Sequence, residues 1–188
     1  MQRPDEELYR LMKEGESSAF AELYDRREPG LYRYALHMTG SVTAAQEIAH
    51  DVFLQLMSAT NRFDAGRGSL EGWMYGVARN LVRVFRRKGS VEAAVDQVFH
   101  DDILGELIDS ETMAALHTAI RELPDHYREA VVLCDLEERN YDEAARLMGC
   151  PLGTVRSRLH RARGLLAAKL KRVRQGQGIR RPELSFTG

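Results

Sequence analysis

Apolar residues recur at intervals of three and four along two stretches in the first half of the chain, the spacing of one face of an α-helix. The first stripe consists of Ala45, Ile48, Ala49, Val52, Phe53, Leu56 and Met57. The second consists of Leu70, Trp73, Met74, Val77, Ala78, Leu81, Val82 and Phe85. Ser69 and Gly89 are suited to begin and end the second helix. The pattern predicts two amphipathic helices, each buried through its stripe.

The faces opposite these stripes carry candidate binding groups. The first helix leaves Glu47, Asp51 and Leu54 outside its stripe. The second leaves Arg79, Asn80, Arg83, Arg86 and Arg87. Spacings of three, four and seven bring these arginines along one edge, where they repel one another unless a polyanion neutralises them. A polar loop at 60–68 offers Asn61, Arg62 and Arg67 to a ligand. The two helix faces can also be ordinary solvated surfaces, and the loop at 60–68 can simply turn the chain; these alternatives remain open.

Three further helices are predicted after residue 120. Leu123-Pro124 opens the first, Asn140 and Glu143 suit a capping box at the start of the second, and Gly149 suits its end. The third runs from Thr154 to about Lys171, and its outward side chains are Arg156, Ser157, His160, Arg161 and Arg163. Two helices joined by a tight glycine turn, with arginines on the second, are typical of a helix-turn-helix that enters the major groove. A generic helical hairpin is the alternative.

The net charge of -1 conceals a strong segregation of charge along the chain. Residues 1–89 carry 13 Lys and Arg against 12 Asp and Glu, whereas residues 90–120 carry 7 acids and no base. Residues 121–150 carry 4 bases and 8 acids, and residues 151–188 carry 10 bases and 1 acid. The basic C-terminal segment indicates a nucleic-acid surface. The acidic stretch indicates a linker between two lobes.

Composition narrows the class of protein. The 188 residues suffice for one domain or two small ones, and 44% hydrophobic residues suffice for a core. Two cysteines are too few for a disulfide framework. The first residues are charged where a signal peptide would be apolar, and the apolar runs are too short to span a membrane. We therefore expect a cytoplasmic, all-α protein without membrane insertion, made of two small helical domains joined by an acidic linker. The expected parts are a domain at 1–89, a linker at 90–120, a helix-turn-helix domain at 121–172 and a disordered tail at 173–188.

Specific motifs in both halves resemble a known family. Leu123–Leu133, Tyr141–Ala145 and Gly153–Arg163 resemble the fourth conserved region of bacterial sigma factors, of the compact extracytoplasmic-function (ECF) type. Ala45–Leu54 and Gly68–Asn80 resemble the second region of the same factors, in the expected order. The resemblance covers roughly residues 15–172. It implies a factor that binds core RNA polymerase and directs promoter recognition, DNA melting and transcription initiation, with a domain for the minus-ten element followed by one for the minus-thirty-five element.

The resemblance also implies roles for individual residues. Core polymerase would contact Glu47, Asp51, Phe53 and Leu54. The minus-thirty-five element of promoter DNA would be read by Arg156, Ser157, His160 and Arg161. The minus-ten element would be opened and held by Asn61, Arg62, Arg67, Asn80, Arg83, Arg86 and Arg87. An anti-sigma protein is a further candidate partner. The chain departs from the family at Gln46, His50 and Val84.

The sequence lacks the features that other classes of function require. Glu47 and His50 have the spacing of a di-iron ligand pair, but such sites need a second copy and the chain has none. A zinc site from the cysteines and histidines lacks the usual paired spacing, and no nucleotide-binding fingerprint is present. We therefore expect no enzyme activity, catalytic residue, cofactor or metal. The alternative function is that of a conventional helix-turn-helix regulator, which binds duplex DNA without polymerase. A sigma mimic that binds an anti-sigma protein but not DNA is disfavoured, because such a protein would have no use for the arginine face.

Overall fold

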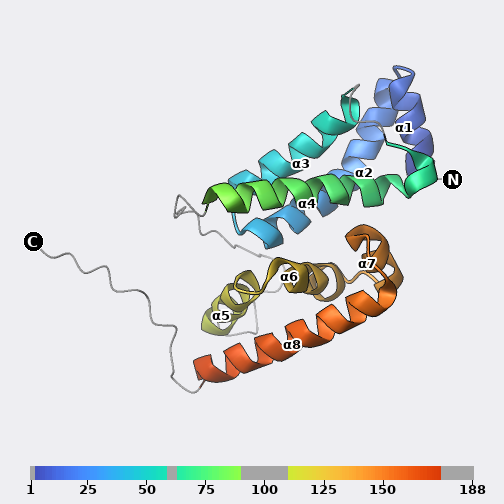
Figure 1. Ribbon diagram of the computed structural model, residues 1–188. Helices are drawn as coiled ribbons and strands as arrows, with labels where there is room; N and C mark the ends of the chain where they lie inside the picture. Colours follow the sequence, from blue (N-terminus) through green and yellow to red (C-terminus); the bar gives the residue numbers. More distant parts are fainter. Residues whose placement is uncertain (1–2, 59–62, 90–109, 175–188) are drawn as a thin grey trace, which may run out of the picture.

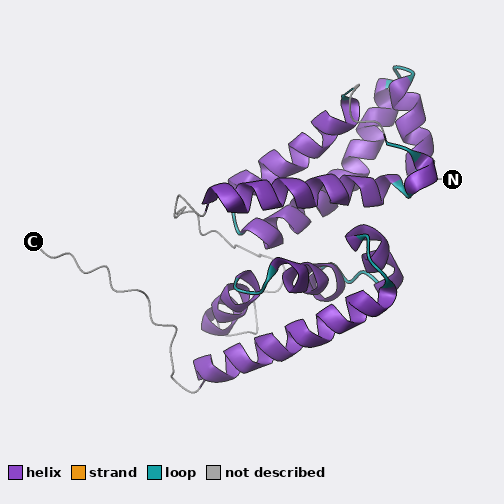
Figure 2. Cartoon of the chain, in the orientation of Figure 1, coloured by secondary structure: helices purple, strands orange, loops and turns teal. Residues whose placement is uncertain are grey.

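Every regular element in the residues that the computed structural model describes, which are 3–58, 63–89 and 110–174, is a helix or a helical turn. Short loops and turns connect the successive helices within 3–58 and within 110–174 (Figure 2). The elements in order are α1 (Asp5–Lys13), α2 (Ser17–Thr39), α3 (Val42–Met57), the 3-10 turn η1 (Ala65–Arg67), α4 (Leu70–Gly89), α5 (Ser110–Arg121), α6 (Asp125–Val131), the π-helical turn η2 (Val132–Leu136), α7 (Tyr141–Met148) and α8 (Leu152–Arg174). None of the described helices is long and apolar enough to cross a membrane. The predicted all-α class is confirmed.

The first four helices pack around one apolar core, with α2 against α1, α3 and α4. Gly40 lets the chain turn between α2 and α3, because its φ of 74° is a left-handed conformation that side chains disfavour. Ser41 then caps α3 by accepting a hydrogen bond from the amide of Ala44. The predicted stripe of α3 is buried except for Met57, which is 46% exposed at the last position of the helix.

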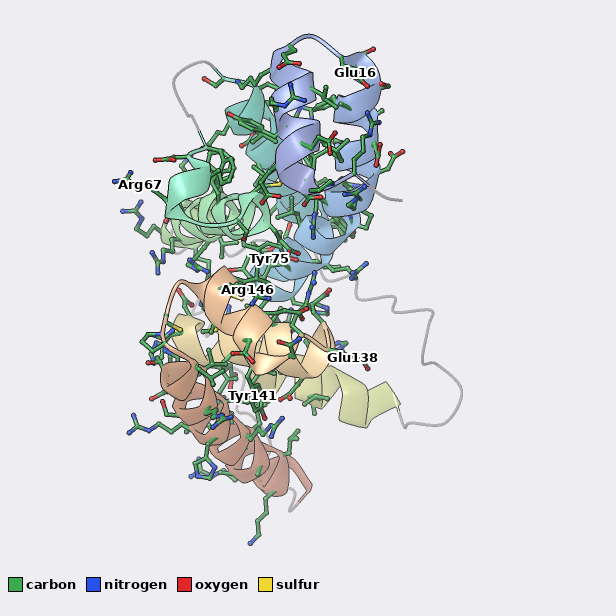
Figure 3. All side chains as sticks on the ribbon, turned by 90° about the vertical axis from the view of Figure 1, so that its right-hand side faces the viewer. Glu16, Arg67, Tyr75, Glu138, Tyr141 and Arg146 are labelled. Carbon is green, nitrogen blue, oxygen red and sulfur yellow. The ribbon has the colours of Figure 1, made fainter. Side chains whose placement is uncertain are left out.

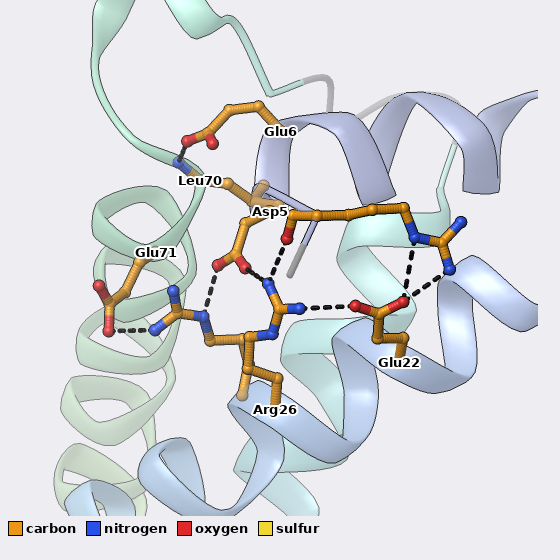
Figure 4. Close-up of polar contacts among 8 residues, drawn as sticks. Asp5, Glu6, Glu22, Arg26, Leu70 and Glu71 are labelled. Carbon is orange, nitrogen blue, oxygen red and sulfur yellow. Dashed lines mark hydrogen bonds and ion pairs between the residues drawn. The ribbon is translucent and has the colours of Figure 1, made fainter. Parts of the chain in front are cut away.

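A network of charged side chains fastens α1 to its neighbours (Figure 4). The carboxylate of Asp5 is almost fully buried and accepts hydrogen bonds from Arg26 at 2.8 Å and Arg27 at 2.5 Å. Arg27 also binds Glu71 on α4 at 2.5 Å. Glu6 accepts from the backbone amide of Leu70, one of the groups that the start of α4 leaves without a helical partner. The network therefore sets the angle at which α4 leaves the loop before it.

The last four helices form a second unit in which α8 packs against α5, α6 and α7. The predicted capping box is present: Asn140 accepts from the amide of Glu143, whose carboxylate accepts from the amide of Asn140. Gly149 ends α7 with a φ of 61°, as its position predicts. The helix begun by α6 continues as η2, and Arg128 is buried where α6 meets the end of α5.

The two units lie directly against each other (Figure 1). α4 packs on α7, and α2 packs on α5, α6 and η2. Tyr75 lies at this boundary (Figure 3), stacked edge-to-face on the buried ring of Tyr34. Gly30 allows the close approach, because a Cβ atom there would lie 3.2 Å from the hydroxyl oxygen of Tyr75. The two lobes expected from the sequence therefore share one contiguous core.

Two expected boundaries differ from the structure. α5 begins at Ser110, so the expected linker at 90–120 ends too late. Ala119 and Ile120 of this helix are buried and Leu116 is half-buried against the core, which explains why the segment is helical despite its acidic surroundings. α8 runs on to Arg174, past the expected end of the domain at 172. The remainder of the linker, 90–109, and the tail from 175 lie outside the described residues.

Candidate nucleic-acid and polymerase interfaces

The outer face of α8 is an exposed cationic surface. Arg156, Ser157, His160 and Arg161 are all exposed, whereas Val155, Leu159 and Ala162 on the other side of the same helix are buried. The structure therefore brings together the four residues expected to read the minus-thirty-five element. Gly149 and Pro151 form the turn that sets α8 against α7, the geometry of a helix-turn-helix.

Two residues that the sequence analysis did not single out hold arginines of this face in place. The guanidinium of Arg156 lies 5.8 Å from the centre of the Tyr141 ring at the start of α7, within reach of a cation–π interaction. Asp135 binds Arg163 through two hydrogen bonds of 3.2 and 2.6 Å, which raise the pKa of the guanidinium. The only sequence signal for either was a position next to the end or the start of a predicted helix, which is too general to identify a partner.

The polar side of α4 is divided in the structure. Asn80, Arg83 and Arg87 are exposed, as expected of groups that contact nucleic acid. Arg79, by contrast, is half-buried and donates a hydrogen bond of 2.6 Å to Glu129 of α6. Arg86 forms an ion pair with Asp125, also of α6, and partial burial lowers its pKa. In this structure Arg86 is therefore engaged within the chain.

The loop before α4 contributes an exposed arginine and one wall of a cavity. Arg67 of η1 projects away from the helices (Figure 3). A cavity of about 480 Å³ lies beside it, between Phe63 and Trp73 of the first unit and Arg146 of α7. A hollow of this size with aromatic and guanidinium walls suits a nucleobase, which stacks on such groups. Asn61 and Arg62 lie outside the described residues.

The outer face of α3 carries most of the expected polymerase contacts. Glu47, Asp51 and Leu54 are exposed, and Leu54 leaves 46% of its surface to solvent. Phe53, the fourth residue expected there, is 1% exposed and is not available to a partner. Its ring packs on Tyr24 with 4.6 Å between centroids, and on Phe20. Placing Phe53 at the polymerase surface was wrong, because the same residue belongs to the buried stripe and one side chain cannot occupy both faces.

Two parts of the chain match models of one protein family. Residues 23–91 match Sigma-70 region 2, and residues 113–166 match Sigma-70, region 4. The chain is 30% identical over 184 residues to the ECF RNA polymerase sigma factor SigM of Mycobacterium tuberculosis, covering 96% of this chain and 91% of SigM. The chain belongs to the ECF RNA polymerase sigma factors. This sigma factor accordingly acts in transcription initiation, and the resemblance seen in its motifs is confirmed.

Other relatives agree with this membership. The sigma factor is 30% identical over 158 residues to SigE of Mycolicibacterium smegmatis, covering 76% of the chain and 58% of SigE. It therefore spans little more than half the length of that relative. The sigma factor RpoE from Bartonella quintana, solved in complex with the anti-sigma factor NepR, has the same fold: the TM-score is 0.62 at 24% identity, over 81% of this chain and 96% of RpoE.

Proposed function

We propose that three exposed faces of this sigma factor bind three separate targets. The outer face of α8 reads the minus-thirty-five element, the polar side of α4 with Arg67 holds the minus-ten element, and the outer face of α3 docks on core RNA polymerase. The observation that carries the proposal is the set of exposed side chains on α8, which are Arg156, Ser157, His160 and Arg161. They follow the capped helix α7 and the glycine turn that ends it. Arg side chains there are suited to bidentate pairing with guanine in a major groove about 12 Å wide.

The chemistry of α3 and α4 fits their proposed targets. Glu47 and Asp51 lie one turn apart on α3 with Leu54 beside them, so a basic groove with an apolar floor is the complementary surface. Arg83 and Arg87 are one turn apart at the end of α4, where they can neutralise consecutive phosphates of a separated strand. Residues 61, 62 and 86 complete the proposed minus-ten set. Because polymerase and chromosome share the bacterial cytoplasm, we infer that the chain works there.

An anti-sigma protein is proposed as a further partner by analogy with the fold relative, which was solved with one. The rival proposal, a regulator independent of polymerase, differs in one measurable respect. A regulator binds promoter duplex tightly by itself, whereas a sigma factor needs core polymerase to select a promoter.

The experiment that tests the proposal is run-off transcription with purified core polymerase and genomic template, followed by sequencing of the start sites. We expect initiation at a shared pair of elements only when the chain is added. A variant with Glu47→Lys and Asp51→Lys should fail to be captured by core polymerase, while Asp25→Lys, an exposed acid on α2, should be captured normally. Tight duplex binding without polymerase, and no new start sites with it, would favour the regulator.

A further inference from the structure

Three side chains of α1 contact the chain where α3 ends and where α4 begins. Glu6, Tyr9 and Lys13 follow one another at intervals of three and four residues, so they lie along one edge of α1. We refer to these three residues as the α1 edge. The segment that joins α3 to α4, residues 58–69, carries part of the proposed minus-ten surface. α1 itself is fixed on α2, because the buried carboxylate of Asp5 binds two arginines of α2.

Lys13 supplies a positive charge where α3 ends. The last turn of α3 contains no basic residue, although a helix C-terminus carries partial negative charge and unpaired carbonyl groups. The ammonium group of Lys13 donates to the carbonyl oxygen of Met57 at 3.3 Å and to that of Ser58 at 3.5 Å. A residue of α1 therefore caps α3 at the point where the joining segment begins.

Glu6 supplies the opposite charge where α4 begins. Its carboxylate accepts a hydrogen bond of 3.1 Å from the amide of Leu70, the first residue of α4 (Figure 4). A carboxylate is favourable there, because a helix N-terminus carries partial positive charge. Ser69 accepts a hydrogen bond from the amide of Gly72, a second amide of the same turn. The start of α4 is thus fixed relative to α1.

Tyr9 lies between these two caps in the α1 edge and supports the wall of a cavity. Its ring meets the ring of Phe63 edge-to-face, with centroids 5.6 Å apart and planes at 88°. The ammonium group of Lys13 lies 5.7 Å from the centre of the Tyr9 ring. Phe63 in turn lines the cavity of about 480 Å³, together with Trp73 and Arg67. Tyr9 therefore fixes the orientation of a ring on which a base could stack.

The α1 edge holds the joining segment at its beginning, at Phe63 and at its end. Twelve residues, 58–69, separate α3 from α4. A segment of this length that is fixed only at its ends has many conformations, and binding a ligand in one of them costs conformational entropy. Contacts that are already made in the free protein reduce this cost. The α1 edge makes such contacts, and it makes them from outside the proposed DNA surface.

We infer that Glu6, Tyr9 and Lys13 are positioning residues for the minus-ten strand, which arrange Phe63 and Arg67 for binding without contacting the strand themselves. The inference rests on the proposed minus-ten role of Arg67 and α4. If loss of the α1 edge leaves about one-tenth of the chains with the segment correctly placed, the apparent affinity for the strand falls about tenfold. Docking on polymerase through α3 and reading of the minus-thirty-five element through α8 should not change.

The test compares the wild-type chain with a variant that carries Tyr9→Leu and Lys13→Met. The matched control carries Tyr9→Phe and Arg10→Met. It keeps the aromatic ring at position 9 and removes one positive charge from the same helix, as the variant does. The only described partner of Arg10 is Glu14, in an exposed ion pair one turn farther along the chain. A difference between variant and control therefore cannot come from the net charge of α1.

Each protein is assembled with core polymerase and titrated with a fluorescein-labelled single strand that carries the non-template minus-ten sequence of a start site mapped by run-off transcription. We expect the variant to bind about tenfold more weakly and the control to bind like the wild type. Lys13→Met alone, at an exposed residue where folding tolerates the change, should cause a smaller loss of about threefold. In the free chain, acrylamide should quench Trp73, the single tryptophan, more strongly in the variant than in the control, because Trp73 lines the same cavity as Phe63.

Three results would overturn the inference. The first is a variant that is folded by circular dichroism and binds the strand as tightly as the wild type. The second is an equal loss of affinity in the control. The third is an equal loss of polymerase capture or of minus-thirty-five preference in the variant, which would give the α1 edge a general structural role. Failure of the wild-type holoenzyme to prefer this strand over a scrambled one would instead reject the proposed minus-ten role of α4 and Arg67.

Discussion

Arg128 donates a hydrogen bond of 2.9 Å from Nη1 to the backbone carbonyl of Met38, joining α6 to the end of α2 across the boundary between the units. The same guanidinium binds the carbonyls of Ile120 at 3.1 Å and Leu123 at 2.9 Å. Burial, together with the nearby cations Arg86 and Arg121, lowers the pKa of Arg128 to about 10. The group therefore remains protonated at neutral pH and satisfies carbonyls that the ends of α2 and α5 leave open.

Replacing Arg128 with Met should destabilise the chain strongly. The substitution leaves several buried carbonyl oxygens without a donor, each at a cost of about 1–3 kcal/mol, so we expect a loss of at least about 3 kcal/mol in the free energy of unfolding. Urea denaturation followed by circular dichroism measures it. The control is Arg10→Met, whose exposed ion pair with Glu14 is worth about 0.5 kcal/mol. Equal losses in the two variants would contradict the role given to Arg128.

Adjacent residues on α3 should separate stability from polymerase binding. Phe53→Ala empties a buried aromatic site and should lower the free energy of unfolding by about 3–5 kcal/mol. Leu54→Ala trims an exposed side chain and should change stability by at most about 0.5 kcal/mol. Capture on immobilised core polymerase should nonetheless weaken for Leu54→Ala. A folded Leu54→Ala chain captured as well as the wild type would remove Leu54 from the proposed docking face.

Arg161 is proposed to contact a base edge, and its replacement should reduce promoter discrimination. Arg161→Ala should cost about 1–3 kcal/mol in the preference of the holoenzyme for the native over an altered minus-thirty-five element. Competitive run-off transcription on the two templates measures the preference. Lys171→Ala, at an exposed site two turns or more farther along α8, is the control and should leave the preference unchanged. If Arg161→Ala discriminates as well as the wild type, Arg161 does not read a base.

The buried hydroxyl of Tyr34 should make stability fall at alkaline pH. Burial and the neighbouring Glu129 carboxylate hold the pKa of Tyr34 well above 10, its ordinary value. Above pH 10 the unfolded chain releases this proton and the folded chain retains it, so the stabilisation from Tyr34 is present below pH 10 and is lost as the pH rises further. At about pH 11 the loss should reach about 1.4 kcal/mol.

Urea denaturation of the wild type and Tyr34→Phe at about pH 8 and about pH 11 isolates this contribution. The gap in stability between the two proteins should shrink by about 1.4 kcal/mol at the higher pH, while titration of other groups cancels in the comparison. A gap that stays constant between the two pH values would mean that Tyr34 ionises normally in the folded chain.

Local sequence signals anticipated most of the secondary structure. The stripes of α3 and α4, the capping box at Asn140 and the glycine at 149 each act over a few residues, so their effect can be judged from spacing alone. Misjudgements arose where long-range packing decided the outcome. The helix that begins at Ser110 lies in an acidic stretch without a clear apolar stripe. Burial of Ala119 and Ile120 in the core stabilises it, and that burial depends on tertiary packing.

The amino-acid sequence by itself determined α3, α4 and the three helices after residue 120, together with the turn before α8 and the exposed row that includes Arg156 and Arg161, because helical periodicity fixes which side chains share a face. Only the tertiary structure decided that Arg79 and Arg86 face carboxylates of α6. Asp125 and Glu129 are ordinary acids at helical spacing until a second helix, more than 35 positions earlier in the chain, is packed against them. Ion pairs between helices that are distant in sequence depend on how those helices pack in space, and the spacing of residues within one helix does not predict that packing.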